Sequence, residues 1–285
     1  MPCLIAPGAT ARRGLAVIEG GCGASVEVLW VGRDVTGDEA GRRSIQSRHG
    51  GWLHHSSPPH RGASVTATTR TDQRPDVHEM VVVHRTFRRE FPAIAGLIRG
   101  TAEGDTSRAK VVADHLRLCM AGLEMHHTGE DVVLWPLLLE RAAPSTGLVE
   151  RMQAQHHAVD AHVATIEPAL DAWRATPTTA TGDHLATLVQ RFTANLVEHL
   201  DMEEREVLPL ASRHLTAAEW DQMGEHGKNA MSASQLPIMF GLVLEDADDG
   251  ERARMLAHLP VPIRVALKTV GAWQFRRYIR RVRAS

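Results

Sequence analysis

Cysteine, lysine and tyrosine are scarce in this chain of 285 residues. The three cysteines, Cys3, Cys22 and Cys119, form no CxxC pair, which argues against a disulfide framework and indicates a reducing compartment. We therefore expect a cytoplasmic protein. The single tyrosine, Tyr278, lies in the C-terminal tail, so a tyrosine ligand within the predicted bundle is not expected.

Long apolar runs and a strong net charge are also missing. No apolar stretch reaches the ~18 residues of a membrane span, so no integral span is expected. A net charge of −2 is not basic enough to indicate a nucleic-acid partner. With 43% hydrophobic and 23% charged residues, the composition is that of a soluble globular protein of one or two domains.

Residues 1–75 differ from the rest of the chain. They are rich in Gly, Ser, Pro and His and show little helical periodicity, so we expect a largely disordered N-terminal extension. No 7–15-residue apolar stretch follows Arg12 and Arg13, and a signal peptide is not expected. A sharper hypothesis is that residues 1–64 are not made in the native protein and that translation starts at Val65 instead. Peptides from 1–64 in the native protein would refute it.

Residues 76–214 are predicted to form four helices. Pro75 and Gly100 bound the first, Asp105 is a suitable N-cap for the second, and Pro168 predicts a kink or break in the third. Short connections favour antiparallel neighbours, so the predicted fold is all-α, an up-down-up-down four-helix bundle. The expected helices cover residues 76–99, 105–143, 145–175 and 182–214.

Residues 215–285 are predicted to form a C-terminal helical extension. Thr216 and Glu219 make a capping box that opens a short helix, and further helices are expected over 237–245, 250–258 and 262–283. Residues 264–283 are basic and contain no acid. We interpret them as a solvated face of an appendage, with contact to an anionic surface as the alternative.

One pattern occurs twice in the predicted bundle. His126 is followed by Glu130 and then Pro136; His199, Glu203 and Pro209 repeat the same spacing. Residues i and i+4 lie on one face of a helix, about one turn apart. Each copy therefore presents an imidazole and a carboxylate to the same point.

Each pair also has a histidine on the preceding helix. His84 and His156 are 72 residues apart, and the two His-Glu pairs are 73 apart. A single His-x-x-x-Glu match could arise by chance among 17 histidines, but the shared proline register and matching offsets argue against chance. Burying such a set without a metal or a polar network would be costly. The predicted metal ligands are His84, His126, Glu130, His156, His199 and Glu203.

The pseudo-twofold pattern predicts two metal ions. One would take His84 and His126 and the other His156 and His199, with the two glutamates, each having two oxygens, bridging them. An oxide or hydroxide bridge would leave at least one position open. Imidazole and carboxylate ligands with open positions suit non-haem iron that handles O₂, whereas a closed tetrahedral zinc site fits less well.

Two histidines and two glycines lie close to the predicted ligands in sequence but are not expected to bind metal. His127 and His157 point ~100° away from the adjacent ligands and are expected at the rim or surface. Gly122 and Gly129 lie near the ligand face, where they would leave space for a ligand channel.

These residues resemble the haemerythrin, or HHE cation-binding, family. The similarity runs from about Met80 to His214 and is carried by Val83-His84, His126 to Pro136, Gln155-His156 and His199 to Pro209. It implies two non-haem iron ions that bind or react with O₂, nitric oxide or peroxide, in oxidative or nitrosative stress or in iron homeostasis. Peroxide-decomposing and nitric-oxide-reducing activities are the enzymatic possibilities.

One position departs from the oxygen-carrying members of that family. They have a fifth histidine one turn after the helix-3 ligand, where this chain has Asp160. Because of this difference, we expect reaction with peroxide or nitric oxide rather than O₂ storage. Asp160 is either a seventh ligand or, as we favour, an acceptor for an imidazole N–H or a solvated residue. The alternative functions are a module that senses O₂ or iron through residues 215–285, and an iron-centre repair protein that donates iron.

Overall fold

The computed structural model describes residues 73–142 and 146–284, without the side chains of 227–230. Every regular element in this part is helical, which confirms the all-α prediction. The predicted disorder of the N-terminal extension and the alternative start at Val65 concern residues that lie outside the described range or at its border.

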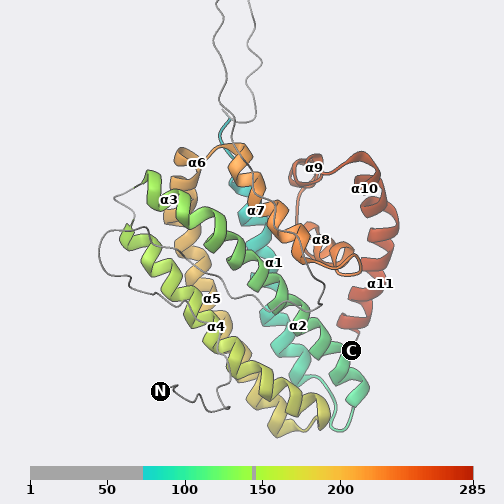
Figure 1. Ribbon diagram of the computed structural model, residues 1–285. Helices are drawn as coiled ribbons and strands as arrows, with labels where there is room; N and C mark the ends of the chain where they lie inside the picture. The colour runs from blue at the N-terminus through green and yellow to red at the C-terminus, as the bar shows by residue number, and fades with distance from the viewer. Residues whose placement is uncertain (1–72, 143–145, 285) are drawn as a thin grey trace, which may run out of the picture. The chain divides into compact units, whose positions relative to one another are not determined.

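Four long helices form the bundle: α1 (His78–Arg99), α2 (Thr106–Gly129), α4 (Thr146–Ala175) and α5 (Thr179–Met202). Helix α1 packs on α2 and α5, and α4 packs on the same two helices from the other side (Figure 1). At one end Gly104 N–H donates to Pro177 O at 2.9 Å, which joins the α1–α2 and α4–α5 connections. At the other end Arg141 donates to His214 O at 3.1 Å, so successive helices run in opposite directions.

The helix starts follow from local side-chain caps. Asp105 accepts from Arg108 N–H at 2.8 Å and begins α2. Thr178 and Thr181 form a capping box, so α5 begins at Thr179 rather than at the predicted residue 182. Helix α4 continues through Pro168, so a break there is not found.

Two short π-helical segments interrupt the predicted second and fourth helices. Segment η2 (Glu130–Leu134) leads into α3 (Trp135–Arg141), and η4 (Glu203–Val207) leads into α6 (Leu208–His214). Pro136 and Pro209 stand at the same position after each segment. Because proline has no N–H and its ring meets the carbonyl four residues earlier, the backbone widens by one residue there. Each ligand glutamate is the first residue of such a segment.

The predicted ligands occupy a polar layer between two apolar clusters. The larger cluster is centred on pairs such as Phe91 and Phe192, whose rings meet edge to face at 4.8 Å. The smaller one holds Trp135, Met152 and Val207. Packing on both sides fixes the axial position of the layer and keeps water out of it.

The C-terminal segment packs against the side of the bundle formed by α1 and α2 (Figure 1). Thr216 and Glu219 form the predicted capping box. The helices there are α7 (Ala217–Ala230), α8 (Leu236–Leu244), α9 (Asp249–Ala257), α10 (Val261–Ala266), η5 (Leu267–Gly271) and α11 (Ala272–Arg283).

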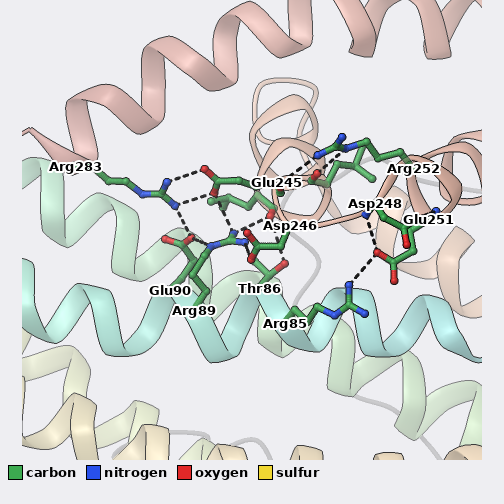
Figure 2. A network of polar contacts seen from close by, with 12 residues as sticks. Arg85, Thr86, Arg89, Glu90, Glu245, Asp246, Asp248, Glu251, Arg252 and Arg283 are labelled. Carbon is green, nitrogen blue, oxygen red and sulfur yellow. Dashed lines mark hydrogen bonds and ion pairs between the residues drawn. The ribbon is translucent and has the colours of Figure 1, made fainter.

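A network of charged side chains joins this segment to α1 (Figure 2). Buried Glu90 accepts from Arg89 at 2.6 Å and from Arg283 of α11 at 3.0 Å. Arg283 also donates to Glu245 at 2.7 Å, and Arg85 donates to Glu251 at 2.9 Å. The segment is therefore held to the bundle by partly buried ion pairs as well as by apolar contacts.

Tyr278 of α11 reaches the bundle, although it is far along the chain. Its hydroxyl lies 2.9 Å from Nδ1 of His115 on α2, whose Nε2 donates to Glu90 at 3.0 Å. Within the described residues no helix is both long and apolar enough to cross a membrane.

Candidate metal centre

The structure brings all six predicted ligands together in the middle of the bundle. His84 comes from α1, His126 from α2, His156 from α4 and His199 from α5, and the two carboxylates come from the π segments. Their donor atoms fall into two sets, each within 4.8 Å: His84, His126, Glu130 and Glu203; and His127, Glu130, His156 and His199.

The imidazoles pair as the sequence pattern predicts. His84 Nε2 and His126 Nε2 are 3.1 Å apart, and the two rings meet edge to face. His156 and His199 form the other pair, with ring centroids 4.8 Å apart. Two nitrogens this close, each with a lone pair directed inwards, are suited to one shared cation.

Each carboxylate lies between the two pairs. Glu130 Oε1 is 3.2 Å from His126 Nε2, and its Oε2 is 3.2 Å from His156 Nε2. Glu203 Oε2 is 3.3 Å from His84 Nε2 and 3.9 Å from His199 Nε2. Both glutamates are therefore positioned to contact two cations at once, which is the arrangement expected of bridging ligands.

The other ring nitrogen of three histidines is held by a polar partner. His84 Nδ1 donates to Glu204 at 2.8 Å, and His199 Nδ1 donates to Gln155 at 3.2 Å. His156 Nδ1 donates to Asp131 at 3.0 Å. Such contacts set the tautomer and ring orientation, leaving Nε2 for a metal.

Asp131 takes the role that the sequence suggested for Asp160. Asp131 follows Glu130 in the π segment and also accepts from Trp135 Nε1 at 2.9 Å. Asp160 is exposed on α4, as is His157, which agrees with the surface position predicted for that histidine. Asp131, Glu204 and Gln155 each adjoin a predicted ligand in sequence, and that adjacency is the only signal for them.

The prediction that His127 lies at the rim is wrong. His127 is only 5% exposed, and its ring stacks on His156 with centroids 4.1 Å apart and planes at 12°. Helix α2 is contacted by α1, α4 and α7, and its solvent-facing side at this level carries Glu124 instead. A residue ~100° from the ligand face is therefore still buried.

Several buried polar atoms of this layer lie within ion-pair distance of one another but make no well-aligned hydrogen bond in the described part of the chain. They are both oxygens of Glu130 and of Glu203, and Nε2 of His127, His156 and His199. Unsatisfied groups of this kind cost roughly 1–3 kcal/mol each when left buried. Imidazole and carboxylate donors directed to common points fit a pair of iron ions, which would satisfy these atoms.

Neighbouring carboxylates favour the protonated form of two imidazoles in the cluster. Burial by itself would lower the pKa of His84, but Glu203 and Glu204 raise it to about 9. Asp131 and Glu130 overcome burial and raise the pKa of His156 to about 10. Burial and the nearby Glu203 charge raise the pKa of Glu130. Metal binding would displace the imidazole protons and take over their role.

Fold and site together define a helical protein with a buried centre of imidazoles and carboxylates suited to metal binding. Residues 76–211 match the family model of the Hemerythrin HHE cation binding domain, and this segment is therefore a member of that family. The match confirms the resemblance seen in the sequence and implies metal binding, with iron as the expected metal. No curated protein and no solved structure matches the chain.

Proposed function

We propose that the bundle holds two non-haem iron ions and binds or turns over O₂, peroxide or nitric oxide. The observation that carries the proposal is the pair of donor sets that share Glu130, with Glu203 reaching across as well. Iron held by imidazoles and carboxylates supplies one-electron redox chemistry towards such small molecules.

The protein's own contribution is to position donors and exclude water. Glu204, Asp131 and Gln155 fix three imidazoles, while the apolar clusters above and below keep the layer dry. Asp160 is exposed at the position where oxygen carriers have their fifth histidine. This difference favours reaction with peroxide or nitric oxide over reversible O₂ storage.

The test is the optical spectrum of iron-loaded protein before and after peroxide or nitric oxide is added. We expect about two iron ions per chain and a spectrum of paired iron that changes with one of these ligands. Glu130→Ala and Glu203→Ala should lose that spectrum while the bundle stays helical by circular dichroism. Glu150→Ala, an exposed position on α4, is the matched control.

The outcomes separate the alternatives. Rapid O₂ evolution from peroxide supports turnover, a stable and reversible spectrum with O₂ supports carriage, and iron transfer to an apo acceptor supports a repair role. An unchanged paired-iron spectrum in Glu203→Ala would remove the bridging assignment, and absence of iron after expression in iron-rich medium would remove the proposal.

A sensing function is the second candidate, because α7 packs on the segment that carries Glu130. A Cβ built at Gly129 would lie 3.8 Å from the backbone of Met223, so α7 is in contact distance of the residue before Glu130. A change in the π segment on loading the metal would therefore reach the C-terminal segment directly. Hydrogen exchange in α7 that differs between iron-loaded and iron-free protein would support it.

A further inference from the structure

A cavity of about 320 Å³ lies between the bundle and the C-terminal segment. Its walls come from α1 and α2 on one side and from α7, α8 and α9 on the other. Six methionines line it: Met80, Met125, Met223, Met231, Met239 and Met255. The volume is within the range of sites that take organic ligands and exceeds the need of a diatomic gas.

One wall of this methionine-lined cavity is His126, which also belongs to the candidate metal centre. Gly122 and Gly129 contribute the same wall, as the sequence analysis anticipated for glycines near the ligand face. At Gly122 the missing side chain makes room for the methyl group of Met239, and at Gly129 the nearest atoms to a built Cβ are 3.8 Å away. His126 and these two glycines thus place the cavity next to the ligand layer.

The polar groups of the cavity are mainly acidic. Glu79, Asp221 and Glu225 line it, and no lysine or arginine does so among the side chains that the structure describes. His258 Nε2 is 3.1 Å from Glu79, and its Nδ1 is 3.8 Å from Asp221. These contacts join α1, α7 and the end of α9, so the walls are held together and do not depend on a ligand.

We propose that the methionine-lined cavity binds a neutral or cationic apolar organic molecule with one end against the His126 imidazole. Flexible, polarisable methionines accept varied apolar shapes, and apolar cavities bind such ligands because water is poorly held there. The acidic groups disfavour anions. The proposal goes beyond the iron chemistry above, since binding in the cavity does not require a metal.

The test uses fluorescence titration of the full chain, both iron-loaded and iron-free, with neutral 1-aminoanthracene and anionic 1-anilinonaphthalene-8-sulfonate. We expect saturable binding of the neutral probe in both forms and no displacement of it by the anion. In iron-loaded protein the neutral probe should also shift the metal spectrum through His126. Failure of iron binding would leave the iron-free measurement intact, so the two proposals fail separately.

Two variants locate the probe. Val243→Trp fills the cavity from α8 and should raise the Kd of 1-aminoanthracene more than about tenfold. Leu139→Trp, at a position on α3 that is 40% exposed, is the matched control and should bind like the unaltered chain. Gly129→Leu fills the opposite wall if Val243→Trp does not fold. No saturable binding of the neutral probe, its displacement by the anion, or equal affinity of the filling and control variants would overturn the proposal.

A separate surface feature lies on α10, η5 and α11. Five of the seven large apolar side chains exposed in the described residues gather here: Val261, Ile263, Val265, Val270 and Trp273. Exposed Lys268, Arg276 and Arg277 stand among them, and the Arg277 guanidinium lies 5.8 Å from the Trp273 ring centroid. No acid occurs in this stretch.

We infer that this apolar-basic face rests on an anionic lipid surface. Basic residues contribute about 1 kcal/mol each near such a surface, and exposed apolar side chains enter the interface. The solvated basic face expected from the sequence accounts for the charges but leaves the apolar side chains unexplained.

Co-sedimentation with vesicles tests this inference. The full chain should bind vesicles containing phosphatidylglycerol and not those of phosphatidylcholine alone, and added salt should release it. Val270→Ser with Trp273→Ser should abolish binding, while Leu139→Ser, which is 40% exposed on α3, should keep it. No vesicle binding, or self-association of the chain that the double variant removes, would overturn the inference.

Discussion

At the scale of residues, a second hydrogen-bond partner orients three of the four predicted imidazole ligands. His84, His156 and His199 each use Nδ1 for a side-chain acceptor, so each Nε2 is directed to the centre. Asp131 is placed to accept from His156 because it follows Glu130 in the π segment that faces α4. Asp160, one turn after His156 in its own helix, remains exposed.

Replacing Asp131 should therefore weaken iron binding without unfolding the bundle. We expect Asp131→Asn to lower iron affinity about 10- to 100-fold, since the imidazole of His156 would lose its charged acceptor. Asp160→Asn is the matched control and should leave affinity unchanged. Competition with a chelator of known affinity measures both. An equal loss in the two variants would contradict the role given to Asp131.

At the scale of elements, buried Glu90 joins three helices. It belongs to α1 and accepts from His115 of α2 and Arg283 of α11. Burial alone would raise its pKa, but hydrogen bonds from His115 and Arg89 lower it to about 2 from an ordinary value of 4.5. A lowered pKa stabilises the fold above pH 4.5, and that stabilisation is lost as the pH falls towards 2.

Glu90→Gln should reduce the free energy of unfolding of the iron-free protein at pH 6 by about 3 kcal/mol, the equivalent of this pKa difference. The difference from the unaltered chain should shrink as the pH approaches 3. Urea unfolding at both pH values measures it, with exposed Glu150→Gln as the control. A difference that does not depend on pH would show that the carboxylate charge of Glu90 is not the cause.

The contact between α8 and α11 depends on a missing side chain at Gly241. A Cβ built there would overlap the Phe275 ring, whereas one built at Gly96 on α1 meets nothing within 4 Å. Gly241→Ala should separate α11 from α8 and speed tryptic cleavage after Arg276 and Arg277. Gly96→Ala should leave cleavage unchanged and stabilise α1 by up to about 1 kcal/mol, because alanine favours a helix. Equal cleavage of both variants would contradict this packing.

At the scale of the whole molecule, the metal centre is expected to govern stability. Donors come from α1, α2, α4 and α5, so a bound metal ties all four bundle helices together. Without it, the unsatisfied oxygens of Glu130 and Glu203 stay buried. The iron-free protein should thus be folded but have a smaller free energy of unfolding.

Iron removal should lower the midpoint of thermal unfolding. A ligand present at 100 times its Kd stabilises the native state by about 2.7 kcal/mol. Scanning calorimetry of iron-loaded and iron-free protein should show this loss, and restoring iron should reverse it. Glu130→Ala, which lacks one shared donor, should show a smaller difference between the two forms. Identical midpoints with and without iron would contradict a site that spans four helices.

Much of the bundle could be predicted from local patterns. The four long helices, the capping box at Thr216 and the short helices after it lie close to their predicted positions. The π segments were not predicted, although Pro136 and Pro209 were the visible signal. The predicted helices ran past both prolines unchanged, because a proline in a helical pattern does not by itself show whether the helix kinks, ends or widens.

The sequence by itself determined which six donors converge, because i and i+4 spacing on a helix sets direction without reference to the rest of the molecule. Only the tertiary structure decided that His127 is buried, that Asp131 holds His156, and that a methionine-lined cavity ends at His126. Each of these depends on what packs against a helix from a distant part of the chain. Periodicity along one helix indicates where a side chain points, whereas α4 and α7 determine what it meets there.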